Sequence, residues 1–145
     1  MGYCVKLTVT GQAEKVSNSE GLPVSDFIRR QIGCEYFELV TSKMLKDGFF
    51  LVVDENGLYQ EKPFINPFAS WLYKYHEHGQ SIVGIALVMK TVETSEGPDI
   101  GFLDENEADF LVAWLKERKP IMARDFVSAL SVFDHDAIVG DSRNV

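Results

Sequence analysis

The stretch that decides the fold lies at residues 81–91 and reads SIVGIALVMKT. Its apolar run extends from Ile82 to Met89 with one interruption, Gly84. A short apolar run of this kind is typical of a buried strand, so we expect this segment to be central in a β-sheet. The run is far shorter than the roughly 20 residues that cross a bilayer as a helix, and it therefore predicts no membrane span.

Further strand-like segments precede this run. Residues 5–9 and 35–44 alternate apolar and polar side chains, and residues 49–53 are all apolar. Asn56-Gly57 follows them and is the strongest short-range hairpin signal, because both residues tolerate positive φ. We therefore expect a β-hairpin at Asn56-Gly57, within an antiparallel meander. Two polar or acidic segments are expected to be connections: residues 11–21 and residues 91–101.

Capping residues predict where the first two helices begin and end. Ser25 is expected to cap a short helix that Gly33 ends. Asn66 before Pro67 starts the second helix, because a proline at the first helical position loses no hydrogen bond. Gly79 is expected to end this helix. Its apolar stripe is formed by Phe68, Trp71, Leu72 and Tyr75.

Two more helices are expected near the C-terminus. Asp104 and Glu107 make an acidic capping box at the start of the third helix, with Leu103 before it as the apolar staple residue. Pro120 is expected to end that helix. A last apolar stripe then predicts a fourth helix, with Met122, Phe126, Leu130 and Phe133.

These elements predict an α+β domain with a mixed or mostly antiparallel sheet, packed by about four helices of which two are C-terminal. The 145 residues and the hydrophobic content of 46% suit one globular domain. We assign this domain to residues 1–133 and expect residues 134–145 to form a loose C-terminal tail.

The charge balance excludes some partners. Lys and Arg number 14 against 22 Asp and Glu, which gives a net charge of −8. Such a surface gains nothing from counterion release, so we expect no direct binding to nucleic acid or to anionic membranes. The sequence begins with no signal peptide, and its only cysteines are Cys4 and Cys34. We therefore expect a cytoplasmic protein in which both thiols are reduced and packed as small hydrophobic groups.

Motifs that carry catalysis are missing from the sequence, which has no Gly-rich phosphate loop, nucleophile elbow or dinucleotide fingerprint. We favour a non-enzymatic protein without a cofactor. The alternative is a small-molecule or metal-binding protein, or an enzyme, that uses Cys34 together with His76 and His78. The two histidines lie two positions apart, whereas side chains meet on a helix at a spacing of three or four. An interaction with the C-terminal end of the second helix is a sufficient reason for their presence.

Acidic residues are concentrated in one segment. Residues 91–115 contain seven acids and no base: Glu93, Glu96, Asp99, Asp104, Glu105, Glu107 and Asp109. We predict that five of them form a surface that binds a basic protein partner: Asp99, Asp104, Glu105, Glu107 and Asp109. A sharper alternative is a DNA-mimicking inhibitor of a host defence nuclease, which requires carboxylates spaced like phosphates on one face.

Aromatic residues cluster around the expected hairpin and the second helix. Any that are exposed would form an interface, for which a homodimer is the simplest symmetric outcome. The residues concerned are Phe49, Phe50, Phe64, Phe68, Trp71 and Tyr75.

Six segments carry a resemblance to a known family. They are Leu22-Pro23 with the short helix after it, residues 32–38 (IGCEYFE), residues 53–58 (VDENGL), Asn66-Pro67 with Ala69, Ile82-Val83-Gly84, and residues 103–115. Together they resemble the small bacterial, plasmid and phage proteins called domain of unknown function 3846, over about residues 1–118. The chain departs from the pattern at Gly33, where the family has a glycine pair, and in its additional C-terminal helix. The resemblance implies a mobile genetic element and no mechanism, so the leading hypothesis is a non-enzymatic accessory protein that binds another macromolecule.

Overall fold

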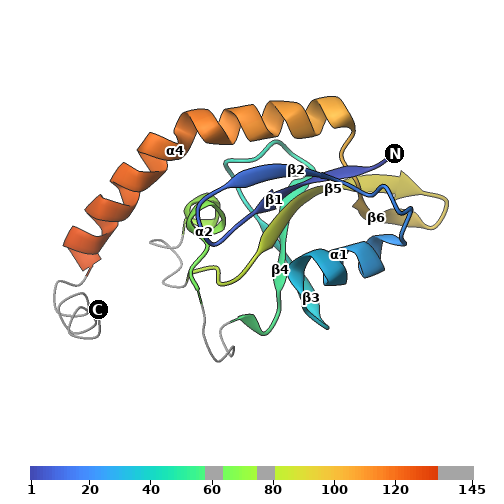
Figure 1. Ribbon diagram of the computed structural model, residues 1–145, viewed down its shortest axis with the longest axis horizontal. Coiled ribbons are helices and arrows are strands. Elements are labelled where there is room, and N and C mark those ends of the chain that lie inside the picture. Colours follow the sequence, from blue (N-terminus) through green and yellow to red (C-terminus); the bar gives the residue numbers. More distant parts are fainter. Residues whose placement is uncertain (58–63, 75–80, 134–145) are drawn as a thin grey trace.

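A computed structural model describes residues 1–57, 64–74 and 81–133, with residues 126–133 described by their backbone alone. The described strands are β1 (Tyr3–Leu7), β2 (Ala13–Ser17), β3 (Phe37–Thr41), β4 (Phe49–Asp54), β5 (Ala86–Thr94) and β6 (Gly97–Gly101). The described helices are α1 (Val24–Ile32), α2 (Pro67–Tyr73) and α4 (Glu105–Phe133). Figure 1 follows them along the chain. The predicted α+β class is confirmed.

All six described strands form one antiparallel sheet, in the order β2-β1-β5-β4-β3. The first half of β5 lies between β1 and β4, and its second half pairs with β6. The prediction that residues 81–91 supply the central strand is therefore confirmed, with β5 beginning at Ala86. Burial explains this position, because the side chains from Ala86 to Met89 are fully buried.

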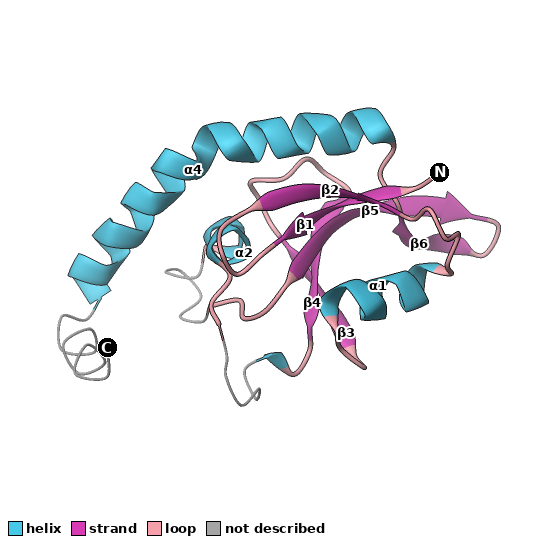
Figure 2. Ribbon diagram, viewed as in Figure 1, coloured by secondary structure: helices cyan, strands magenta, loops and turns pink. Residues whose placement is uncertain are grey.

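Helices cover both faces of the sheet, and alternate residues of each strand pack on opposite sides. On one face, Phe27 and Ile28 of α1 pack in a cluster with Val52, Leu87 and other strand residues. On the other face, α2 and α4 pack in a second cluster that includes Leu51 and Val88. Figure 2 shows α1 and α4 on opposite sides of the strands. The hydrophobic core is thus divided into two layers by the sheet.

The structure has three helices among its described residues, not the four predicted. The error lies at Pro120, which is inside α4 and does not end it. A proline inside a helix removes one backbone hydrogen bond and bends the helix, and α4 bends between its two halves in Figure 1. The second half is nonetheless held in place, because Met122 is buried and Asp125 accepts a hydrogen bond of 2.8 Å from the indole of Trp71.

Two segments predicted to be connections contain strands. β2 lies within residues 11–21 and pairs with β1 across a turn in which Gly11 has a φ of 81°. β6 lies within residues 91–101 and forms a hairpin with the end of β5. Both segments lack the apolar alternation of a half-buried strand: the exposed residues are Glu14 and Lys15 in β2, and Pro98 and Asp99 in β6. Pairing with a buried neighbour therefore decides their structure.

The Asn56-Gly57 turn does not join β4 to a neighbouring strand in the part of the chain that the structure describes. β4 pairs with β3 on one side and with β5 on the other. The return strand expected after Gly57 would begin at residues 58–63, which lie outside the described residues. The hairpin of this region is instead β3 with β4, joined by residues 42–48.

Helix ends follow the predicted signals in part. Asn66 caps α2 as expected by accepting a hydrogen bond of 3.1 Å from the amide of Ala69, and Gly33 ends α1 with a φ of 76°. Ser25 does not cap α1, which begins one residue earlier, after Pro23. α2 ends at Tyr73 with Lys74 in the left-handed conformation. The expected stop at Gly79 lies outside the described residues.

Candidate functional site

The capping box at the start of α4 fixes the helix that forms one wall of the site. The carboxylate of Asp104 accepts a hydrogen bond of 2.8 Å from the amide of Glu107, and the carboxylate of Glu107 accepts one of 2.9 Å from the amide of Asp104. These reciprocal bonds satisfy two backbone amides near the helix start. The predicted capping box is therefore confirmed, and it sets the position of the side chains that follow.

Strand β2 holds the first two turns of α4 against the sheet. The ammonium group of Lys15 lies 2.9 Å from a carboxylate oxygen of Glu105 and 2.8 Å from one of Asp109. The hydrogen bonds from Lys15 to Asp109 and to Glu105 raise the pKa of the lysine. Because two carboxylates share one ammonium group, this trio has a net charge of −1.

The loop between β3 and β4 forms the opposite wall. The hydroxyl of Ser42 donates a hydrogen bond of 2.7 Å to the carbonyl of Leu72 in α2, and it accepts one of 3.2 Å from the amide of Met44. Leu45 is buried, and the amide of Phe49 closes the loop on the carbonyl of Lys46 at 3.0 Å. The loop is therefore attached to α2 and has a defined shape.

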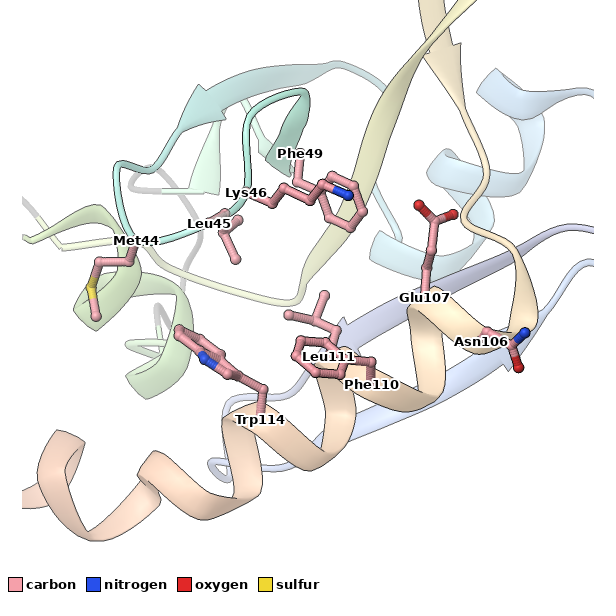
Figure 3. A pocket seen from close by; sticks show the side chains of 9 residues that line it. All are labelled: Met44, Leu45, Lys46, Phe49, Asn106, Glu107, Phe110, Leu111 and Trp114. Atoms are coloured by element: carbon pink, nitrogen blue, oxygen red, sulfur yellow. The ribbon is translucent and has the colours of Figure 1, made fainter.

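An apolar cavity of about 540 Å³ lies between this loop and the first half of α4. Its apolar lining residues are Met44, Leu45, Phe49, Phe110, Leu111 and Trp114, and its polar ones are Lys46, Asn106 and Glu107. In Figure 3, Phe110, Leu111 and Trp114 project from the helix toward the loop, and Leu45 projects from the loop toward the helix. Phe110 is 71% exposed at the rim. A cavity of this size and lining is typical of a binding site.

Charged groups border the apolar lining. The ammonium group of Lys90 lies 2.6 Å from the carboxylate of Glu107, so the charge of this carboxylate is compensated. The side chain of Lys46 has no ion-pair partner within residues 1–57, 64–74 and 81–125. At the far end, the guanidinium group of Arg118 lies 4.3 Å from the ring centroid of Trp114, which fixes the position of that ring.

The five acidic residues predicted to form one binding surface make different contacts in the structure. Glu105 and Asp109 bind Lys15, and Glu107 binds Lys90 and the start of its own helix. Asp104 is occupied in the capping box, and Asp99 lies on β6, where its carboxylate accepts a hydrogen bond from the amide of Ile100. The structure therefore brings Asp104, Glu105, Glu107 and Asp109 together at the start of α4 and places Asp99 on a strand. Whether they bind a partner stays a prediction.

The cysteines do not behave alike. Cys4 is fully buried, and this burial raises the pKa of its thiol to about 12. The expectation that Cys34 is buried is wrong, because this residue is partly exposed at the end of α1. Burial of its sulfur and the nearby charge of Asp54 raise the pKa of Cys34, which lowers the thiolate fraction that a nucleophile needs.

The histidine alternative falls largely outside the described residues. His76 and His78 both lie in residues 75–80, which the structure does not describe. No group of three or more His, Cys, Asp or Glu side chains that could hold a metal ion occurs in the described parts of the chain. None of the described helices is long and apolar enough to span a membrane.

Sequence reasoning missed the cavity as a site. Leu111 and Trp114 line the cavity from α4, and Leu111 is buried. The available signal was Phe110, an aromatic residue that falls outside the stripe of Leu111, Trp114 and Leu115. Of the aromatic cluster predicted to be an interface if exposed, Phe64 is exposed and Phe68 and Trp71 are buried. Tyr75 lies outside the described residues.

Comparison with known proteins found no matching family model, no matching curated protein and no matching solved structure. The resemblance to domain of unknown function 3846 therefore remains a prediction from the sequence segments that carry it.

Proposed function

We propose that the chain is a non-enzymatic binding protein whose partner is another protein, and that the partner inserts an apolar side chain into the cavity beside α4. The observation that carries this proposal is the cavity of about 540 Å³ with Phe110 exposed at its rim. A large aromatic side chain that is left in solvent beside an apolar cavity is typical of an interface. A partner that covered Phe110 would remove that surface from water.

The charge around the cavity favours a partner segment with basic residues next to its apolar anchor. The whole chain has a net charge of −8. Glu105 and Asp109 retain a net charge of −1 with Lys15 and lie on the same helix as Phe110. Asp104 adds a further carboxylate at the helix start. Complementary charge of this kind speeds association and selects the partner more than it raises affinity.

The wider setting stays a proposal as well. The resemblance to domain of unknown function 3846 suggests an accessory protein of a mobile genetic element. The DNA-mimic alternative requires carboxylates that are free and spaced like phosphates. Glu105 and Asp109 instead share the ammonium group of Lys15, so this alternative becomes an outcome of the test and not a second proposal.

The test uses a defined probe: a synthetic helical peptide with one phenylalanine anchor among lysines, together with the same peptide with glutamates in place of the lysines. Binding is followed by tryptophan fluorescence, to which Trp71 and Trp114 both contribute, and by amide chemical shifts. We expect the lysine peptide to bind and to shift the amides of residues 42–49 and 106–114. Phe110→Ser should weaken binding about 10-fold, which is the ratio that corresponds to about 1.4 kcal/mol.

Two variants separate the contributions. Ile121→Ser is the matched control, since Ile121 is an exposed apolar residue of α4 that does not line the cavity. Reversing Glu105 and Asp109 to Lys should abolish the preference for the lysine peptide. Equal binding of both peptides, or shifts confined to residues away from the cavity, would contradict the proposal. The DNA-mimic alternative would be supported if the protein prevented a nuclease from binding DNA and the Phe110→Ser variant did so equally well.

A further inference from the structure

Strand β3 is the least protected edge of the sheet. It is the last strand in the order and pairs with β4 alone among the described strands. The other two edge strands carry features that oppose pairing with another chain. Lys15 of β2 is bound to α4, and β6 contains Pro98 and the charged Asp99. β3 has the sequence FELVT, with neither proline nor lysine. Within the described residues, the features of β3 that oppose pairing with another chain are its short length and the charge of Glu38.

The backbone groups that β3 leaves open can be identified. The carbonyl of Tyr36 accepts a hydrogen bond of 3.1 Å from the amide of Glu55, so Tyr36 faces β4. Residues of an antiparallel strand alternate between the two sides. The amides and carbonyls of Phe37, Leu39 and Thr41 therefore point away from β4, toward the open edge. The side chain of Leu39 is 48% exposed at the centre of this strand.

We propose that a second copy of the chain adds to this edge, with the two β3 strands antiparallel and the two-fold axis at Leu39. In this register Leu39 lies opposite Leu39 of the second copy, and Phe37 lies opposite Thr41. These are the residues whose backbone groups are open, so each can exchange hydrogen bonds with its counterpart. The paired leucine side chains also cover each other.

Charge complementarity favours this register. Glu38 lies opposite Val40 of the second copy, so no two like charges face each other within the paired strands. Beyond the strand ends, Glu35 lies at a bend and Lys43 in a turn, and the proposed pairing places each near the other residue of the second copy, twice by symmetry. Both side chains are exposed, and neither has an ion-pair partner among the described residues. The pairing would thus provide each of them with a partner.

The expected association is weak, because two five-residue strands bury less surface than a standard protein interface. The first measurement is sedimentation velocity from about 10 µM to 1 mM, the range in which small interfaces associate. We expect a monomer–dimer equilibrium that Leu39→Lys weakens at least about 10-fold, because it places two ammonium groups opposite each other. Ile121→Lys makes the same charge change at an exposed apolar residue of α4 and should leave the equilibrium unchanged.

A charge swap tests the register. Glu35→Lys alone and Lys43→Glu alone should each weaken the dimer, since like charges then meet at both ends. The double variant Glu35→Lys/Lys43→Glu should restore the wild-type dissociation constant. A double variant as weak as the sum of its parts would show that these residues do not meet, and would overturn the proposed register.

Amide hydrogen exchange provides a readout that needs no variant. On going from low to high concentration, the amides of Phe37, Leu39 and Thr41 should become protected, whereas those of Glu38 and Val40 should be protected at both. A chain that stays monomeric at about 1 mM, or a dimer without this alternation, would overturn the proposal. This inference does not depend on the proposed function, because no residue of β3 lines the cavity beside α4.

Discussion

At the scale of single residues, Asn66 connects three parts of the fold through its side chain. It is fully buried, and its side-chain amide donates hydrogen bonds of 2.8 Å to the carbonyls of Leu7 and Gly84. Its side-chain oxygen accepts the amide of Ala69. One side chain thus joins the end of β1, the segment before β5 and the start of α2. This explains why a cap residue lies in the interior.

We expect Asn66→Ala to destabilise the protein by about 2–4 kcal/mol, because it removes a cap and leaves two buried carbonyls without donors. Asn66→Asp keeps the acceptor but places a carboxylate against those carbonyls, which raises its folded-state pKa. Its stability should therefore be highest at acid pH and fall as the pH rises through that pKa. Urea titration at several pH values measures the free energy of unfolding of both variants and its pH dependence. The exposed Asn56→Ala is the control, and a loss there as large would contradict the argument.

At the scale of elements, the start of α4 combines two roles in Glu107. The carboxylate caps the helix through the amide of Asp104 and forms an ion pair with Lys90 of β5. Both side chains of this pair are partly shielded from solvent. The helix is therefore attached to the central strand at the same residue that defines its beginning.

The two roles can be separated by substitution. Glu107→Gln keeps the hydrogen-bond acceptor of the cap and removes the charge, so we expect a loss of at most about 1 kcal/mol that shrinks in high salt. Glu107→Ala removes both and should cost about 1 kcal/mol more, independent of salt. Chemical denaturation at two salt concentrations measures this difference. Glu117→Gln, at a more exposed ion pair with Arg118, is the matched control. Equal losses for Gln and Ala would rule out the capping role.

Elements with local signals were the ones that the sequence could predict. The start of α2 depends on the adjacent residues Asn66 and Pro67, and the capping box depends on Asp104 and Glu107, which are three positions apart. The central strand was predictable because its residues are apolar on both faces. Pro120 misled the prediction, since what holds α4 together beyond it is tertiary: the burial of Met122 and the bond between Asp125 and Trp71.

The candidate site was harder to predict because its parts are far apart in sequence. Lys15 meets Glu105 and Asp109 only after β2 and α4 come together, and no local pattern signals such a contact. The cavity likewise needs the loop at residues 42–48 and the helix at residues 106–114. The sequence shows the acidic segment at residues 91–115 but not the ion pairs that its carboxylates form. It therefore suggests more uncompensated negative charge than the folded protein has.

At the scale of the whole molecule, one sheet separates two apolar layers. Cys4 lies in the layer beneath α1, whereas Trp71 and Trp114 lie in the layer beneath α2 and α4. The same strands supply side chains to both layers, because alternate residues point to opposite faces. Loss of one layer therefore exposes the strands on which the other depends.

We expect unfolding in denaturant to be a single transition that both layers share. In a Cys34→Ser variant, the reaction of Cys4 with a thiol reagent reports on one layer, and tryptophan fluorescence reports on the other. The two midpoints should coincide. Thiol reactivity that appears at a lower denaturant concentration than the fluorescence change would show that the α1 layer opens by itself, and that the two layers are not one cooperative unit.

The position of β5 in the sheet also has a consequence for how the chain folds as it is made. Val5 of β1 pairs with Val88 of β5, so the first strand has no inner neighbour until most of the chain has been synthesised. A hairpin of two strands is marginally stable at best in water. During synthesis on the ribosome, the edge of β1 that pairs with β5 therefore stays unpaired until β5 emerges. Contacts between segments that are distant in sequence, such as this one, slow folding. The sheet can therefore be completed only after the central strand β5 has been synthesised.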